Sequence, residues 1–281
     1  MTEGNPTTAA VTYSSYLKVG ELLSLQEPRS AGPDGRAEHD ELLFITIHQV
    51  YEIWFKQLLH ELRGDETAPG TGGVQGALAA GEGYAALALL GRVLKILKTL
   101  VAQVDVLETM TPLQFGSFRA RLDSASGFQS GQFRELEAVL GRRDARLLAT
   151  AVPGDPVWER VAAAARRPSL WHSFLGYAAG RGVAVPSDVA QRPVTEPCVP
   201  DEALQEALVG MYREDGEAAL VAERLVDLDE GLQEWRYRHV KMVERTIGSK
   251  QGTGGSSGAA YLASTLFTPV FPDLWAARAR F

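Results

Sequence analysis

Cysteine is almost absent from this chain of 281 residues, in which Cys198 stands alone. An internal disulfide needs two thiols, so no disulfide holds the fold together, and a reducing cytoplasm is the expected compartment. The first residues lack the basic segment and apolar run of a secretory signal. No stretch reaches about 18 uncharged apolar residues, so we expect no membrane-spanning helix and no membrane partner.

Positive charge is also scarce. The chain has 28 Lys and Arg residues and 35 Asp and Glu residues, which gives a net charge of −7. A nucleic-acid-binding surface needs a basic patch. The basic residues are instead scattered, and the short pairs Arg142-Arg143 and Arg166-Arg167 are typical of solvated helix faces. We therefore expect no nucleic-acid partner.

A nucleotide-binding motif is missing too, although the stretch GTGGSSG at residues 252–258 has the glycines and hydroxyls of a phosphate-binding loop. A dinucleotide fingerprint would place glycine where Ser257 stands, and it would follow a strand. A P-loop would end in Gly-Lys-Ser/Thr, where this chain has Ala259-Ala260. The glycine-rich stretch must serve another purpose.

Alternation of apolar and polar residues, the pattern of a strand, is rare, and helical spacing dominates. Thr111-Pro112 has the form of a helix start, with Thr as N-cap and Pro in the first turn. We predict one all-α helical-bundle domain over residues 13–281, after a disordered N-terminal tail at residues 1–12. The predicted helices lie near residues 16–23, 39–62, 84–108, 131–140, 155–166, 169–180, 201–212, 216–247, 259–267 and 272–279.

The densest apolar segment is HDELLFITIHQVYEIWFKQLLHEL at His39–Leu62, which contains no Gly or Pro. Its apolar residues cover most of the helix circumference, which predicts a helix buried on nearly all sides. The segment Gly64–Gly83 is rich in Gly, Ala and Thr and predicts a flexible loop, either without helix or with a weak helical turn. The four prolines between residues 183 and 200 predict a second loop.

Only five histidines are available for chemistry, and two of them lie on promising helices. His48 shares a helix face with Phe44, Tyr51 and Phe55, and a core histidine bonded to a backbone carbonyl is the other interpretation of it. His239 has apolar neighbours and nearby arginines, which suits a haem iron ligand whose propionates meet Arg. An interhelical histidine is the other interpretation.

An arginine also occurs among apolar neighbours. Arg119 follows Phe115 and Phe118 on a predicted helix and precedes Leu122. Such an arginine needs a carboxylate partner or a water-filled pocket, unless its side chain extends to the surface.

Three segments together resemble the tryptophan 2,3-dioxygenase family. They are HDELLFITIHQVYEIWFKQLLHEL, ETMTPLQFGSFRARLDSASGFQS and WRYRHVKMVERTIGSKQGTGGSSGAAYL, and the likeness extends from YSSYLKVGELL at Tyr13 to FPDLW at Trp275. The resemblance implies an all-helical homotetramer, a dimer of dimers, in which each subunit holds one haem b between its helices. Ferrous haem and O2 would oxygenate the indole ring of L-tryptophan and give N-formylkynurenine.

The resemblance also implies a role for individual residues. His239 matches the proximal ligand of the haem iron, and His48 matches the distal histidine that meets the indole N–H. Arg119 matches the arginine that pairs with the substrate carboxylate, and Thr253 matches the contact to the substrate ammonium and carboxylate. The remaining matches line the substrate site: Phe44 on the indole, Leu122 and Ser126 in the pocket, and Tyr13, Tyr16 and Leu17 on an N-terminal segment that reaches a neighbouring subunit's site.

Departures from the family pattern leave a second function open. Phe115 stands where many members have a tyrosine that helps to bind the carboxylate, and Val104 where some have a tryptophan. Ser14-Ser15 replaces a common Gly-Gly, and Gly64–Gly83 is longer and richer in glycine than the usual connection. The alternative is a biosynthetic relative that acts on a modified tryptophan, such as one methylated at the β carbon, and inserts one oxygen to give an oxindole. A haem sensor without turnover is disfavoured, because it would not need both Arg119 and Thr253.

Overall fold

A computed structural model describes residues 10–32, 34–64, 72–122, 127–148, 151–248, 250 and 262–281. Within these ranges the chain is helical and no residue lies in a strand, so the predicted all-α class is confirmed. An isolated bridge between Ala31 and Ala37 closes a turn. The longer helices are α3 (His39–Arg63), α5 (Gly83–Leu107), α7 (Gly131–Leu140), α8 (Pro156–Ala165), α9 (Leu170–Gly180), α11 (Glu202–Arg213) and α12 (Glu217–Ile247). The shorter helices are α1 (Tyr13–Leu17), α2 (Val19–Leu23), α4 (Gly73–Ala79), α6 (Pro112–Arg119), α10 (Ser187–Ala190) and α14 (Pro272–Ala277), with 3-10 turns at Gly127–Gln129, Ala145–Leu148 and Arg278–Arg280.

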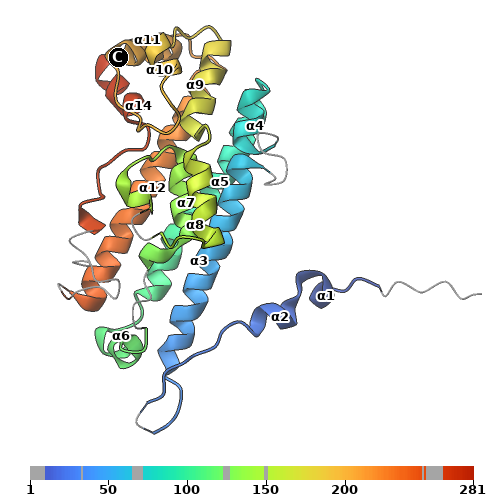
Figure 1. Cartoon of the computed structure of the whole chain (residues 1–281), viewed down its shortest axis with the longest axis vertical. Helices are drawn as coiled ribbons and strands as arrows, with labels where there is room; N and C mark the ends of the chain where they lie inside the picture. Colours follow the sequence, from blue (N-terminus) through green and yellow to red (C-terminus); the bar gives the residue numbers. More distant parts are fainter. Residues whose placement is uncertain are drawn as a thin grey trace, which may run out of the picture.

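Helices α3, α5 and α12 run side by side along the long axis of the molecule (Figure 1). Two ion pairs join α5 to α12, one between Lys98 and Glu234 at 2.5 Å and one between Asp105 and Arg238 at 2.5 Å. Residue numbers increase in the same order along both helices, so the two helices run in the same direction. Gly231 allows the close approach, because a Cβ at this position would lie 2.7 Å from Cδ2 of Leu97. Helix α3 runs the opposite way, and its Tyr51 hydroxyl donates to the Leu100 carbonyl oxygen at 2.9 Å.

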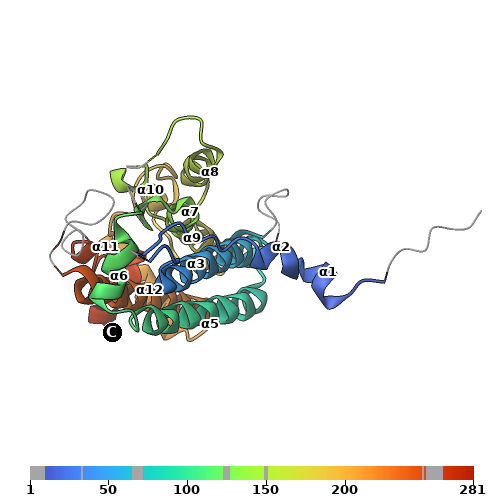
Figure 2. The same cartoon turned by 90° about the horizontal axis from the view of Figure 1, so that it is seen from below.

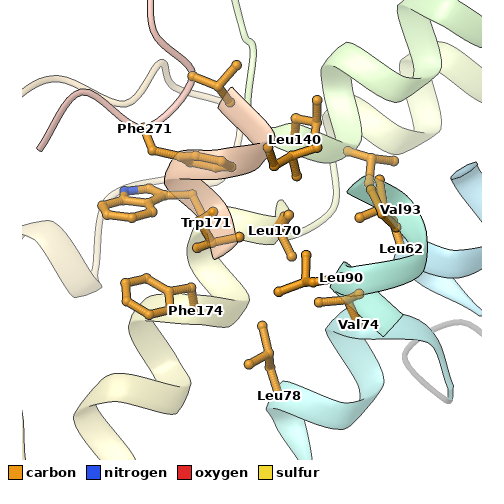
Figure 3. Packing of buried hydrophobic residues seen from close by; sticks show 14 of the residues in the cluster. Leu62, Val74, Leu78, Leu90, Val93, Leu140, Leu170, Trp171, Phe174 and Phe271 are labelled. Carbon is orange, nitrogen blue, oxygen red and sulfur yellow. The ribbon is translucent and has the colours of Figure 1, made fainter. Parts of the chain in front are cut away.

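The main hydrophobic core fills the end of the bundle where α3, α4, α5, α7 and α9 meet the C-terminal segment (Figure 3). Ten of its buried members are labelled there: Leu62, Val74, Leu78, Leu90, Val93, Leu140, Leu170, Trp171, Phe174 and Phe271. Burying each large apolar side chain contributes about 1.5–3 kcal/mol, so this cluster makes a large favourable contribution to folding. A smaller cluster around Ile47, Leu107, Met110 and Phe118 packs at the other end of α3.

Side-chain caps fix where several helices begin. The Thr111 hydroxyl accepts from the Gln114 backbone N–H at 3.3 Å, while the Gln114 side chain accepts from the Thr111 N–H at 2.8 Å. With Pro112 in the first turn, this capping box confirms the predicted start of α6. The Asp155 and Asp201 side chains cap α8 and α11 by accepting from the backbone N–H groups of Val157 and Leu204.

Two sequence expectations about packing were wrong. Helix α3 is not buried on nearly all sides, because Leu42 is 47% exposed and Ile53 is 50% exposed in the single chain. Part of the predicted loop Gly64–Gly83 is helix α4, which buries Val74 and Leu78 against α3, α5 and α9, while residues 65–71 lie outside the described residues. Glycine-rich sequence has a low helix propensity, but the packing of Val74 and Leu78 outweighs it.

Smaller differences concern helix lengths. Lys18 adopts a left-handed φ of 51° and divides the expected first helix into α1 and α2. The proline-rich segment 183–200 contains the short helix α10. The expected helix 259–267 is only partly described, and residues 262–263 are helical. Residues 1–9 of the expected tail lie outside the described ranges.

The N-terminal helices α1 and α2 extend away from the bundle (Figures 1 and 2). Neither helix contains a buried residue. Tyr13 and Tyr16 are each 77% exposed, and Leu17 is 46% exposed. Contiguous exposed apolar side chains of this kind are typical of an interaction surface.

Candidate functional site

A cavity of about 260 Å³ lies among α3, α5, α6, α7 and α12. Its walls contain predicted site residues from three separate parts of the sequence: Phe44 and His48 on α3, Arg119 and Leu122 at the end of α6, and His239 on α12. Other side chains around it are largely apolar, including Tyr51, Phe55, Val104, Phe115, Phe133, Trp235, Met242 and Val243. Concave, mostly apolar sites with a few convergent polar groups are typical of ligand pockets.

His48 is held in a defined orientation by its own helix. Its Nδ1 lies 2.7 Å from the carbonyl oxygen of Phe44, one turn earlier. Because a carbonyl oxygen only accepts, Nδ1 carries the proton and Nε2 presents a lone pair. Burial lowers the pKa of His48 below 6.5, against opposing contributions from the Phe44 hydrogen bond and the Glu52 charge. The side chain is therefore a neutral hydrogen-bond acceptor at neutral pH.

His239 lies in the wall formed by α12 and is also neutral. Burial, followed by the nearby His48, lowers the pKa of His239 to about 4. The ring stacks on Trp235, with centroids 5.5 Å apart and planes 16° apart. A neutral imidazole with a free lone pair is the form that binds a metal.

The donor set fits haem better than a bare metal ion. Among the described residues, no group of three or more His, Cys, Asp and Glu side chains is arranged to hold a metal. Zinc and calcium sites need several protein ligands, whereas haem iron is held by one or two side chains and brings its own nitrogens. The cavity supplies this arrangement, with one buried neutral imidazole at His239, largely apolar walls and several arginines among its lining residues.

Cys198 does not line this cavity, and burial raises the pKa of its thiol. A thiol that stays protonated is a poor iron ligand. Cys198 is therefore not a candidate haem ligand in this cavity.

An aromatic group forms the wall next to His48. The ring of Phe44 lies 4.1 Å from the His48 ring, 5.8 Å from Phe115 and 5.6 Å from Phe118, measured between centroids. Phe118 is fully buried and supports the other two rings. Flat apolar walls of this kind suit an aromatic ligand.

Arg119 ends α6 beside this aromatic group. Its side chain is half-buried, and the cavity includes it. A guanidinium at the edge of an apolar pocket binds carboxylates well, because its N–H groups match two carboxylate oxygens. Leu122, also half-buried, follows on the same wall.

The other sequence-predicted site residues are not brought to the cavity within the described chain. Tyr13, Tyr16 and Leu17 lie on the exposed α1, away from their own cavity. Ser126 and Thr253, with the whole glycine-rich stretch 252–258, lie outside the described residues. Their roles remain predictions.

Sequence reasoning missed a charged group in the cavity wall. The cavity lining includes Glu137 on α7, and this carboxylate pairs with Arg134 on α7, Arg142 just after it and Arg236 on α12, which line the cavity too. The polar residues along α7 gave no sign of this group in the sequence, because Glu137 is buried only when α7 packs between its neighbours.

None of the helices in the described ranges is both long and apolar enough to cross a lipid bilayer.

Comparison with known proteins agrees with this arrangement. The family model for tryptophan 2,3-dioxygenase matches residues 3–155 and 195–281. The tryptophan 2,3-dioxygenase of Anaeromyxobacter sp. (strain K) is 61% identical over 278 residues, which covers 99% of each chain. That of Herpetosiphon aurantiacus is 57% identical over 96% of this chain and 98% of its own length. That of Bordetella pertussis is 39% identical over 95% of this chain and 90% of its own length. Matches of this extent, on a helical fold with His48, Arg119 and His239 around one cavity, mean that the chain belongs to the tryptophan 2,3-dioxygenase family.

Proposed function

We propose that this chain is a haem-dependent dioxygenase that inserts O2 into the indole ring of L-tryptophan and releases N-formylkynurenine. The observation that carries the proposal is the convergence of His48, His239 and Arg119 on one cavity with an aromatic wall. The relatives at 57–61% identity are named for the same reaction and match nearly the full length. Residues 13–281 would form a single haem-binding domain.

His239 would hold the cofactor as the proximal ligand, with haem b as the group and ferrous iron as its active form. When bound, haem supplies the activation of dioxygen that amino-acid side chains do not provide. The neutral state of His239 supports this role, because no proton has to leave the ring before ligation. The aromatic and aliphatic walls would exclude water from the reacting atoms.

The substrate is a zwitterion attached to an apolar ring, and the cavity offers matching groups. Phe44 would pack on the indole, with Leu122 beside it, and the Arg119 guanidinium would bind the carboxylate. Thr253 is proposed to contact the ammonium and carboxylate, and Ser126 to line the pocket, both by resemblance alone. These contacts would fix the ring before oxygen transfer.

His48 would accept a hydrogen bond from the indole N–H through Nε2. The Phe44 carbonyl oxygen supports this role, because its bond to Nδ1 leaves Nε2 unprotonated. The hydrogen bond orients the indole and stabilises positive charge that develops on its nitrogen. We do not assign His48 as an obligatory base, because an N–H that stays bound needs no prior proton removal.

We further propose a homotetramer, a dimer of dimers, in which the N-terminal segment of one subunit completes a neighbour's site. The exposed Tyr13, Tyr16 and Leu17 on α1 support a contact outside the single chain. Light scattering of the full chain and of a variant lacking residues 1–24 tests this. Loss of both the tetramer and tight tryptophan binding in the truncated chain is expected, and an unchanged KM would contradict the role of the segment.

The deciding experiment is the product mass after reaction of ferrous, haem-loaded protein with L-tryptophan and heavy-isotope dioxygen. Two labelled atoms in one ring-opened product are expected. A single labelled atom would instead support the monooxygenase alternative that forms an oxindole, and substrates methylated at the β carbon would then be compared. Protein that binds haem and tryptophan but gives no product would contradict both.

A further inference from the structure

The charged group formed by Arg134, Glu137, Arg142 and Arg236 has no part in the function proposed so far. It lies in the wall of the same cavity as His239, between α7, the turn after α7, and α12. Buried charges usually occur in balanced pairs. This group is not balanced, because its three arginines meet two carboxylates, Glu137 and the Asp144 that pairs with Arg142.

Glu137 is only 4% exposed, and its carboxylate accepts hydrogen bonds from all three arginines. Its Oε1 accepts from Arg236 Nη2 at 2.9 Å and from Arg142 Nη1 at 3.1 Å. Its Oε2 accepts from Arg134 Nη1 at 2.5 Å. The lone pairs of this carboxylate are therefore largely engaged, and little capacity remains for a further donor on Arg236.

Arg236 is the least satisfied of the three arginines. It is 5% exposed, and its Nη1 is buried without a hydrogen-bond partner in the described part of the chain. Burial, and then the Arg142 charge, lower the pKa of Arg236 to about 10, against Glu137 and Asp229. The guanidinium is still charged at neutral pH, but its surroundings compensate that charge incompletely.

The nearby acidic side chains do not fully compensate the charge of Arg236. Asp144 lies 3.4 Å from Arg142 and compensates that guanidinium. Asp229, two helical turns before Arg236, already accepts from the backbone N–H groups of Val270 and Phe271 and from Trp275 Nε1. An anion from outside the chain would complete the site, because a buried guanidinium donor without a partner is destabilising.

The position of Arg236 identifies the anion. Arg236 precedes His239 by three residues, a rise of about 4.5 Å along α12, and both side chains line one cavity. A haem held at His239 carries two propionate carboxylates on one edge of an otherwise apolar ring. Arg119, on the wall beside Phe44 and His48, is already assigned to the substrate carboxylate.

We propose that Arg236, held in place by Glu137 and assisted by Arg134 and Arg142, binds a propionate carboxylate of the haem. The inference rests on the proposed function, because it requires haem at His239. It assigns Arg236 a role in cofactor binding, in addition to its structural contact between α7 and α12.

Two forms of the cofactor test it: haem, and haem whose two propionates are methyl esters. The apoprotein is loaded with each, and the rate of loss to an excess of a haem-scavenging protein is measured. For wild type we expect slower loss of haem than of the diester. In Arg236→Gln, loss of haem should accelerate about tenfold or more, with little change for the diester. Arg236→Lys should recover part of the difference, because it retains the charge.

Arg238→Gln is the matched control, because Arg238 lies on the same helix but pairs with Asp105 and Glu108 outside the cavity. Equal acceleration for haem and diester in Arg236→Gln would show that Arg236 only supports the fold, and would overturn the inference. Unchanged rates would overturn it as well. Should Arg236→Gln fail to fold, Arg236→Lys with the two cofactors makes the same comparison. Wild-type protein that binds neither form would contradict the proposed function itself.

Discussion

The Nδ1 atom of His48 lies 2.7 Å from the carbonyl oxygen of Phe44, and the rings of these two residues are 4.1 Å apart. One residue therefore fixes the tautomer of the histidine and forms the aromatic wall beside it. The two groups expected to meet the indole, an acceptor for its N–H and a flat surface for its ring, are positioned by a single helical turn. The hydrogen bond that sets the His48 tautomer is therefore local to α3.

Replacement of His48 should weaken recognition of the indole N–H. We expect His48→Ala to raise the KM for tryptophan by an amount equivalent to about 1–3 kcal/mol, because a buried donor loses its acceptor. Tryptophan methylated at the indole nitrogen lacks this donor and provides the comparison. Wild type should discriminate strongly between the two substrates, and His48→Ala should not. Full discrimination by the variant would exclude the proposed hydrogen bond.

Replacement of Arg119 should affect carboxylate recognition alone. Arg119→Ala is expected to weaken binding of tryptophan by about 2–5 kcal/mol, because the substrate carboxylate would be buried without its partner. Binding of tryptamine, which lacks the carboxylate, should change little. Arg121→Ala is the matched control, since Arg121 is exposed and two residues further along. Comparable losses for tryptophan and tryptamine would mean that Arg119 supports the pocket wall instead.

Removal of the His239 imidazole should abolish tight haem binding. His239→Ala protein purified after haem loading should lack a full Soret band, and added imidazole should restore part of it. His60→Ala is the control, because His60 is exposed on α3 and does not line the cavity. An intact Soret band without imidazole would show that another residue is the ligand.

Acidification should weaken tryptophan binding only below the ordinary histidine pKa. Burial holds the pKa of His48 below 6.5 in the folded protein, so its Nε2 is a free acceptor throughout the neutral range. The KM should be constant above pH 6.5 and rise as pH falls through the lowered folded value. The unfolded chain takes up the proton first, so the contribution of His48 to stability also declines as pH falls below 6.5. A KM that changed between pH 7 and 8 with the same dependence in His48→Ala would assign the effect to another group.

The aromatic wall should also contribute to stability. Phe118 is fully buried and lies 5.4 Å from Phe115 between ring centroids, so Phe118→Ala leaves a cavity behind the pocket. We expect the free energy of unfolding to fall by about 3–5 kcal/mol in chemical denaturation. Leu113→Ala on the same helix should change it by less than about 0.5 kcal/mol, because Leu113 is 87% exposed. A small effect at Phe118 would mean that the wall collapses to fill the space.

Most helices could be predicted from the sequence, because their apolar spacing and caps are local properties. Thr111-Pro112 marks the start of α6 whatever surrounds it, and the predicted helices at residues 84–108 and 216–247 correspond to α5 and α12. Helix α4 could not be predicted, because its glycine-rich sequence is stabilised by packing against α3, α5 and α9. The exposed face of α3 escaped prediction for a related reason, since hydrophobicity alone does not show which neighbours are present.

The sequence by itself determined the helical class, the lack of nucleotide motifs and, through its resemblance to a family, the identity of His48, Arg119 and His239 as site residues. Only the tertiary structure decided that these three side chains share one cavity, that burial keeps both histidines neutral, and that Glu137 is divided among three arginines. The physical reason is distance along the chain. Helix spacing and caps act over a few residues, whereas burial, charge balance and hydrogen-bond satisfaction depend on atoms about a hundred residues apart in sequence, such as Glu137 and Arg236.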